Sequence, residues 1–210
     1  ANAPKIALRL MLAHVIAGAS RWRIEPERQQ AASEAIATAL SALPSQTAFT
    51  AEREAARQLL GWNEPDGPLI AYDNSVARTA DVLAQLIALT DKEVMRVLAL
   101  VMAEALASGT ALIDTLGETL AVDVAKHWQP DDTFFELARD REAVGAMLGE
   151  VIGAQAAAGY LTDTGTKKKA IIRKALAGDG RTKVDGWTPR YMRFPQGGYT
   201  GRALLARERA

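Results

Sequence analysis

The helical spacing of its apolar residues constrains the fold of this chain more than any other feature of its sequence. Between residues 91 and 107 the apolar side chains recur at i, i+3 and i+4, which places them on one face of a helix. They are Val94, Val97, Leu98, Val101, Met102 and Leu106. Nearly every other segment has this period, and no alternating apolar and polar run is long enough for a convincing strand. The sequence therefore predicts an all-α fold, a bundle of about eight to nine helices with an irregular basic C-terminal tail.

Turn formers and capping residues set the expected helix boundaries. Pro44 is expected to end the second helix. The stretch "TDKE" at 90–93 is typical of a capping box, in which the side chains of Thr90 and Glu93 each accept a hydrogen bond from the other residue's backbone amide. The segment 62–75 contains two prolines and a glycine, which predicts a loop. The expected helices cover residues 5–17, 26–43, 49–60, 76–89, 91–107, 111–128, 133–139, 141–158 and 166–177.

Composition excludes several classes of site. The 210 residues contain no cysteine, so disulfides, thiolate metal sites and cysteine nucleophiles are absent, and the chain fits a reducing cytoplasm. Hydrophobic residues make up 49% of the sequence, enough for a substantial core. No apolar run reaches the roughly 18 residues that a membrane-spanning helix needs. The opening "ANAPK" has no methionine, and we expect a piece of a longer protein.

The formal net charge is +0, but the charges are divided unevenly along the chain. Residues 1–159 contain 13 Lys and Arg against 21 Asp and Glu, whereas residues 160–210 contain 12 against 4. A basic segment attached to an acidic body either binds a polyanion or folds back onto its own domain. We therefore expect a helical body at 1–158, followed at 159–210 by a basic helix and an extended tail that packs on this body.

The basic part offers a set of candidate DNA contacts. The stretch "TKKKAIIRKALAG" at 166–178 predicts a short helix whose apolar side docks on the body while its basic side faces solvent or phosphates. Solvation and DNA contact are equally good interpretations of these cations. The candidate DNA-binding residues are Lys167, Lys168, Lys169, Arg173, Lys174, Lys183, Arg190 and Arg193.

Aromatic residues alternate with the last of these cations in "KVDGWTPRYMRFP" at 183–195. Trp187, Tyr191 and Phe194 would suit nucleic acid, because aromatic rings stack on bases while cations neutralise phosphates. The alternative is that the rings clamp an extended strap onto the helical body. We favour packing over stacking, because the prolines of this segment suit an ordered, extended chain.

The stretch "AKHWQPDDTFFELARDRE" at 125–142 concentrates residue types that bind metals or transfer protons. They are His127, Asp131, Asp132 and Glu136. Neither the two-histidine zincin pattern nor a calcium-loop spacing is present. A helix end at Pro130, followed by a capping box of Thr133 and Glu136, explains more of these residues. We predict a junction between two helices here, with no metal and no catalytic residue. Glycine-rich nucleotide loops and nucleophile elbows are also absent, so we expect no cofactor and no enzymatic activity.

Several stretches of the chain resemble one family. They are "VMAEALASG", "HWQPDDTFF", "KAIIRKALAG" and the ending "GWTPRYMRFPQGGYTGR". From about Leu8 to Arg202 the chain resembles the C-terminal region of large ParB-like partitioning proteins of α-proteobacteria, often labelled ParB-domain or ParB-like nuclease proteins. Tyr191 stands where the family leads us to expect a tryptophan.

The resemblance implies a bacterial cytoplasmic protein that works on DNA, associated with a plasmid or the nucleoid. In that family a ParB fold and a helix-turn-helix segment precede the helical part. Neither is visible in this sequence, so the resemblance is to the accessory helical part, and the label of nuclease is not carried over.

Three hypotheses about function follow. In the first, the chain is a non-enzymatic, all-helical C-terminal domain of a ParB-like partition protein that supports self-association as a homo-oligomer or binding to partition-complex proteins. Its basic tail would add sequence-independent affinity for DNA, without contact to a membrane. In the second, the chain is a pure protein-interaction module whose basic tail pairs with an acidic body. In the third, a remote alternative, it is a metal-dependent hydrolase or nuclease that uses the acids and histidine of residues 125–142.

Overall fold

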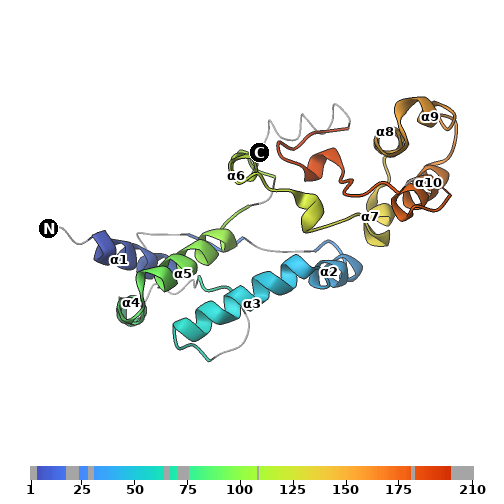
Figure 1. The fold of residues 1–210 in the computed structure, drawn as a ribbon. Helices are drawn as coiled ribbons and strands as arrows, with labels where there is room; N and C mark the ends of the chain where they lie inside the picture. Colours follow the sequence, from blue (N-terminus) through green and yellow to red (C-terminus); the bar gives the residue numbers. More distant parts are fainter. Residues whose placement is uncertain are drawn as a thin grey trace. The chain divides into compact units, whose positions relative to one another are not determined.

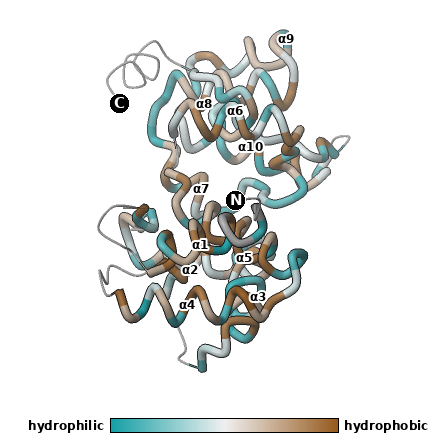
Figure 2. The backbone as a smooth tube through the Cα atoms, turned by 90° about the vertical axis from the view of Figure 1, so that its left-hand side faces the viewer, coloured by the Kyte–Doolittle hydropathy of each residue, from teal (hydrophilic) through white to brown (hydrophobic). Residues whose placement is uncertain are grey.

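The computed structural model describes residues 4–17, 24–27, 31–63, 67–70, 76–107, 109–180 and 183–199. Throughout these ranges the chain forms helices joined by turns and loops, and no strand occurs in them (Figure 1). The predicted all-α fold is confirmed, with ten α-helices and two short 3-10 helices among the described residues. Hydrophobic residues recur in short stretches along these helices (Figure 2), and none of the described helices combines the length and the apolar character needed to cross a membrane.

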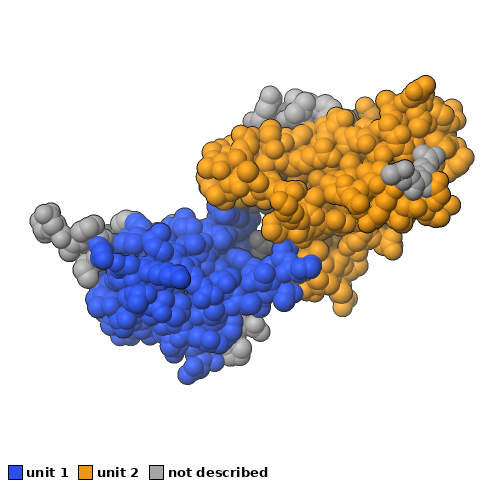
Figure 3. Space-filling view, viewed as in Figure 1, with its two compact units in different colours: residues 1–31, 44–107 blue, residues 32–43, 108–210 orange. Residues whose placement is uncertain are grey.

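The chain divides into two compact units (Figure 3). Unit 1 consists of Ala1–Ala31 and Pro44–Ala107, and unit 2 of Ala32–Leu43 and Ser108–Ala210. The boundary expected at 158 and 159 does not coincide with this division, because it lies inside unit 2. There α8 (Arg141–Ile152) packs against α10 (Gly165–Ala177), one helix from each side of the expected boundary. The basic helix is therefore an integral part of a core.

Unit 1 is built on four helices among its described residues. They are α1 (Pro4–Ala17), α3 (Pro44–Leu59), α4 (Val76–Ala88) and α5 (Asp91–Glu104). α1 packs against α4 and α5, and α5 also packs against α3. The buried side chains of their shared core include Leu12, Ile16, Leu60, Leu86, Val94, Val97 and Val101. Because burying one such side chain stabilises a fold by about 1.5–3 kcal/mol, packing rather than helix propensity holds these helices.

Unit 2 contains six helices among its described residues. They are α2 (Glu34–Ser41), α6 (Ala111–Thr119), α7 (Asp132–Leu137), α8, α9 (Ala154–Ala158) and α10, with the 3-10 helices η1 (Val124–Lys126) and η2 (Arg190–Met192). The core of this unit combines Phe135, Met147, Leu148, Val151, Ile172, Ala175 and Trp187. Trp187 reaches it from the extended segment that follows α10, so that segment contributes to the core.

Two predicted helix ends agree with the structure in detail. The Thr90 side chain accepts a hydrogen bond from the Glu93 amide at 3.4 Å, and the Glu93 carboxylate accepts one from the Thr90 amide at 2.8 Å. This is the predicted capping box. Hydrogen bonds from the Thr90 hydroxyl, at 2.7 Å, and from the Thr90 amide hold the pKa of Glu93 below its ordinary value. At the end of α3, Gly61 has a φ of 70°, a left-handed conformation that glycine adopts without Cβ strain.

Other predicted boundaries are wrong. Pro44 begins α3 instead of ending a helix, because the first helical position makes no use of a backbone N–H. No helix starts at Pro26; α2 begins after Ser33, whose hydroxyl caps it. The single helix expected at 141–158 is divided into α8 and α9 by Gly153, which has a φ of 86°.

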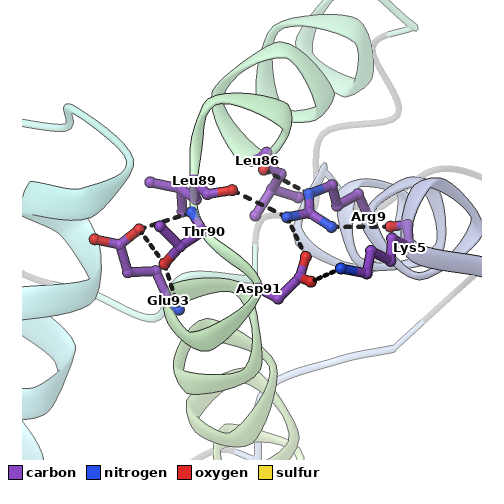
Figure 4. A network of polar contacts seen from close by, with 7 residues as sticks. All are labelled: Lys5, Arg9, Leu86, Leu89, Thr90, Asp91 and Glu93. Atoms are coloured by element: carbon purple, nitrogen blue, oxygen red, sulfur yellow. Dashed lines mark hydrogen bonds and ion pairs between the residues drawn. The ribbon is translucent and has the colours of Figure 1, made fainter.

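A buried arginine joins α1 to the junction of α4 and α5 (Figure 4). Arg9 is only 6% exposed, and its guanidinium donates to the carbonyls of Leu86 and Leu89, each at 3.0 Å, and to Asp91 Oδ1 at 2.8 Å. Lys5 forms a second ion pair with the same carboxylate. Hydrogen bonds from Lys5 and Arg9 hold the pKa of Asp91 below its ordinary value. The cation thus satisfies carbonyls at the end of α4 and an acid at the start of α5.

Candidate functional site

The helix predicted at 166–177 is present as α10. The Thr164 hydroxyl caps it by accepting from the Lys167 amide at 3.3 Å, and Gly178 ends it in the left-handed conformation. Its buried face carries Ile172 and Ala175. The expected amphipathic character is therefore correct, but the cations are not all on the exposed side, because Lys168 is buried with that face.

The three consecutive lysines of α10 each have a partner in unit 2. Lys167 pairs with Asp163 at 3.0 Å on the surface. Lys168 Nζ donates to the Leu161 carbonyl at 3.2 Å, and Lys169 Nζ donates to the Phe135 carbonyl at 2.6 Å. These lysines therefore fasten α10 to the turn after α9 and to α7.

The other cations near α10 differ in their environment. Arg173 forms an ion pair with Asp132 at 2.9 Å, and its guanidinium lies 4.7 Å from the centre of the Phe135 ring. Lys183 pairs with Asp185 at 2.6 Å. Lys174 is exposed, and within the described ranges it has no acidic partner.

The segment 183–199, which we call the strap, is anchored on one glutamate of α8. The Glu150 side chain is 15% exposed and accepts hydrogen bonds from Trp187 Nε1 at 3.1 Å and from the Tyr199 hydroxyl at 2.9 Å. Arg190 forms a close ion pair with the same carboxylate, and Arg193 lies 3.8 Å from it. One half-buried acid therefore binds two candidate DNA contacts and two aromatic residues of the strap.

The strap is also fastened to α6. A Cβ atom at Gly117 would overlap the ring of Phe194, so only a glycine lets the ring lie this close to the helix. The Gln196 amide donates to Asp114 on the same helix at 3.4 Å. Two of the three strap aromatics agree with the favoured interpretation of packing, because Trp187 is 7% exposed and the Phe194 ring lies against Gly117. Tyr191 packs edge-on against Tyr199 at 5.9 Å between ring centres, but it remains 39% exposed.

Burial affects the acidity of two tyrosines in the strap. It raises the pKa of Tyr191 to about 12. The pKa of Tyr199 is raised as well, first by burial and further by the hydrogen bond and charge of Glu150. Both hydroxyls therefore lose their protons at a higher pH than a tyrosine in water does.

The stretch 125–142 forms a junction between helices, as predicted, but with a different capping residue. Asp131, not Thr133, caps α7, and its carboxylate accepts from the Phe134 amide at 2.8 Å. Trp128 packs edge-on against Phe134 with 5.4 Å between ring centres. His127 is exposed at the end of η1.

The acids of this junction are exposed, and Asp132 pairs with α10. In the described part of the chain no group of three or more His, Asp and Glu residues is placed to hold a metal ion. The four residues considered for a metal or acid–base site thus form no such group.

Sequence reasoning found the cations but missed their partners. Glu150 and Gly117 lie on helices whose sequences show no pattern that links them to the strap. The burial of Lys168 did have a signal, because this residue stands four positions before Ile172 and therefore shares its helix face. The chain matches no protein-family model, no curated protein and no solved structure.

The charge asymmetry of the sequence is largely balanced within unit 2. Residues 108–159 contain three Lys and Arg against nine Asp and Glu, and residues 160–210 contain the excess of cations. The ion pairs of Arg173 with Asp132 and of Arg190 with Glu150 connect these two segments. The basic part therefore folds back on an acidic segment of its own unit.

Proposed function

We propose that this chain is a non-enzymatic, helical interaction domain of a ParB-like DNA partitioning protein, which associates with further copies of itself. The family rests on the resemblance of the stretches quoted above. One observation favours a role in protein interaction over DNA binding. Within the described residues, seven of the eight candidate DNA contacts already have an acidic or carbonyl partner in their own unit. The less exposed of these contacts, made by Lys168, Lys169 and Arg190, contribute to folding, and the association depends on other residues.

Apolar side chains on α6 and at the residue that caps its C-terminal end support a protein partner. Leu112 is 57% exposed and Leu120 is 70% exposed, with the half-buried Leu116 between them at i, i+4 spacing. Exposed apolar stripes of this kind mark surfaces at which proteins associate, because association removes them from water. A second copy of the chain would bury the same stripe, as two-fold dimers do.

Sedimentation measurements test the association. The intact chain is expected to sediment as an oligomer, and the double variant Leu112→Glu, Leu120→Glu as a monomer with unchanged helix content. The double variant Ala111→Glu, Thr115→Glu, at exposed positions of α6 outside the stripe, is the matched control and keeps the mass of the oligomer. A monomeric intact chain, or an oligomer that survives the two leucine changes, would contradict self-association through α6.

DNA binding is the second candidate function, and one observation favours it. Lys167, Lys174 and Lys183 are exposed, and exposed ion pairs contribute little to stability, so these lysines could exchange a carboxylate for a phosphate at small cost. Fluorescence titration of a DNA duplex distinguishes the two functions. If DNA is a ligand, affinity falls about tenfold or more between roughly 50 and 200 mM salt, and charge reversal at these three lysines abolishes it.

The interaction proposal predicts the opposite result for this titration. The intact chain and the triple charge-reversal variant should then show equally weak affinity for the duplex. Deleting residues 160–210 is a poor test of either function, because the deletion removes core side chains such as Ile172 and Trp187 and would unfold unit 2.

A further inference from the structure

A groove of about 680 Å³ runs along α8, α9 and the first turn of α10 in unit 2. Its apolar lining contains two large residues, Leu148 and Leu161, and is otherwise made of small ones, which are Gly145, Ala146, Gly149, Ala154, Ala157 and Ala158. Small side chains leave space above two adjoining helices that larger ones would fill. The volume falls in the range of about 300–1,000 Å³ that is typical of small-molecule sites, although the groove is shallow and open to solvent along one side.

One charged side chain is buried against this groove. Lys168 lines it and is only 5% exposed. Its Nζ donates to the Leu161 carbonyl, and among the described residues no carboxylate pairs with it. An ammonium group carries three N–H donors, and burying it without a counter-ion is costly. The groove therefore contains the positive charge of Lys168. Among the described residues no anion pairs with this charge.

Gly145 leaves this ammonium open to the groove. A Cβ atom at position 145 would lie 3.6 Å from Lys168 Nζ, in van der Waals contact. An alanine methyl group would therefore occupy the space in which an oxygen atom could approach the nitrogen. Alanine also favours a helix more than glycine does, so the substitution at this position of α8 should not weaken the fold.

The other charges that line the groove are Arg141 and Glu142, at the start of α8. Arg141 donates to the carbonyl of Thr162 at 3.1 Å, which holds it at the rim. With Lys168, the lining has two positive groups and one negative group, an excess that suits a single anionic head group. The rest of the lining is apolar and suits a hydrocarbon chain.

We propose that this groove binds a small-molecule aliphatic carboxylate. The carboxylate accepts hydrogen bonds from Lys168 Nζ beside Gly145, and the hydrocarbon chain lies over the alanines of α9. An apolar lining with one converging charged group is the usual construction of a site for such a molecule. The site is independent of the proposed association through α6, which contributes no residue to the groove.

Octanoate is the probe, titrated into the full chain and followed by two-dimensional NMR of the backbone amides. Saturable shifts are expected in α8, α9 and α10. Acetate and 1-octanol, which lack the hydrocarbon chain and the charge respectively, are each expected to bind about tenfold or more weakly than octanoate.

Two variants separate recognition from folding. Lys168→Met keeps an unbranched apolar side chain and removes the charge, and Gly145→Ala blocks access to the ammonium. Each is expected to weaken octanoate about tenfold or more, and the thermal stability of Gly145→Ala should equal or exceed that of the parent chain. Lys174→Met, on the exposed side of α10, is the control and leaves the affinity within about twofold.

Several results would overturn the proposal. One is octanoate affinity that is unchanged in Gly145→Ala, a variant that remains informative even if Lys168→Met fails to fold. Another is the absence of saturable shifts with octanoate. Shifts in the same residues with an N-acetylated amphipathic acidic peptide, and none with octanoate, would assign the groove to a protein partner instead.

Discussion

The Glu150 side chain holds several residues of the strap against α8 in unit 2. Its carboxylate accepts hydrogen bonds from Trp187 and Tyr199 and pairs with Arg190. A carboxylate that is largely withdrawn from water needs such partners, and each partner in turn depends on the acid. The attachment of the strap to α8 therefore depends on the charge of Glu150, in addition to the contacts of the strap with α6.

Replacing this acid tests its role at the residue scale. Glu150→Gln keeps the size of the side chain and removes the charge, so the ion pairs to Arg190 and Arg193 are lost. We expect the free energy of unfolding of unit 2 to fall by about 1–3 kcal/mol, measured by urea denaturation with circular dichroism. Glu136→Gln, at an exposed position, is the matched control and should change it by less than about 0.5 kcal/mol. Equal stability of the two variants would contradict the anchoring role.

The raised pKa values of the two strap tyrosines lead us to expect that the folded chain loses stability at alkaline pH. Burial raises the pKa of Tyr191 from 10.0 to about 12. The unfolded chain therefore loses this proton first, so the contribution of Tyr191 is fully present below pH 10 and disappears as the pH rises through 12. Tyr199 acts in the same direction.

Tyr191→Phe removes one of these two contributions. Stability at neutral pH should change by less than about 0.5 kcal/mol, since this hydroxyl has no hydrogen-bond partner among the described residues. Between pH 10 and pH 12 the urea midpoint of the variant should fall less steeply than that of the parent chain. Identical slopes for the two proteins would show that Tyr191 titrates alike in the folded and unfolded chains.

At the scale of elements, Arg9 connects three helices through one planar group. The guanidinium reaches two carbonyls at the end of α4 and the carboxylate of Asp91 at the start of α5 at the same time. A lysine at this position could not make the same hydrogen bonds. The guanidinium of arginine spreads its N–H donors over three nitrogens in one plane, whereas all donors of lysine lie on one nitrogen.

Arg9→Lys should therefore destabilise unit 1 although it keeps the charge. We expect a loss of about 2–4 kcal/mol in the free energy of unfolding, because buried carbonyls and an acid lose their donors. Lys5→Met, which removes the exposed partner of the same acid, should cost no more than about 1 kcal/mol. Urea denaturation of the two variants makes the comparison, and similar losses would mean that charge rather than the fork holds the junction.

At the scale of the whole molecule, each unit has a core of its own. The residues that Glu150 binds all lie in unit 2, and those that Arg9 binds all lie in unit 1. Perturbations should therefore remain within the unit in which they are made.

Hydrogen exchange followed by mass spectrometry measures this independence. Glu150→Gln should speed amide exchange in peptides from α8, α10 and the strap and leave those from α5 unchanged. Arg9→Lys should do the reverse. If either variant speeds exchange throughout the described ranges, the two units unfold as one.

How much the sequence predicts depends on how local the deciding contact is. The helical period and the capping box at Thr90 are local, and both are confirmed. Pro44 shows the limit of a local signal, because proline suits the residue after a helix as well as its first position. The contacts of Glu150 cross 37 and 49 residues to Trp187 and Tyr199, and no spacing rule covers such a distance.

The membership of α2 in unit 2 has a consequence for synthesis on the ribosome. This helix emerges before α3, α4 and α5, yet its contacts in unit 2 are with α7. At roughly 5–20 residues per second, translation of the about ninety intervening residues takes about 5–20 s. A helix of eight residues is marginal in water without packing. Unit 1 forms from the residues before and after α2 in the sequence. During this time α2 has no α7 to pack against, so its apolar face is available to a chaperone.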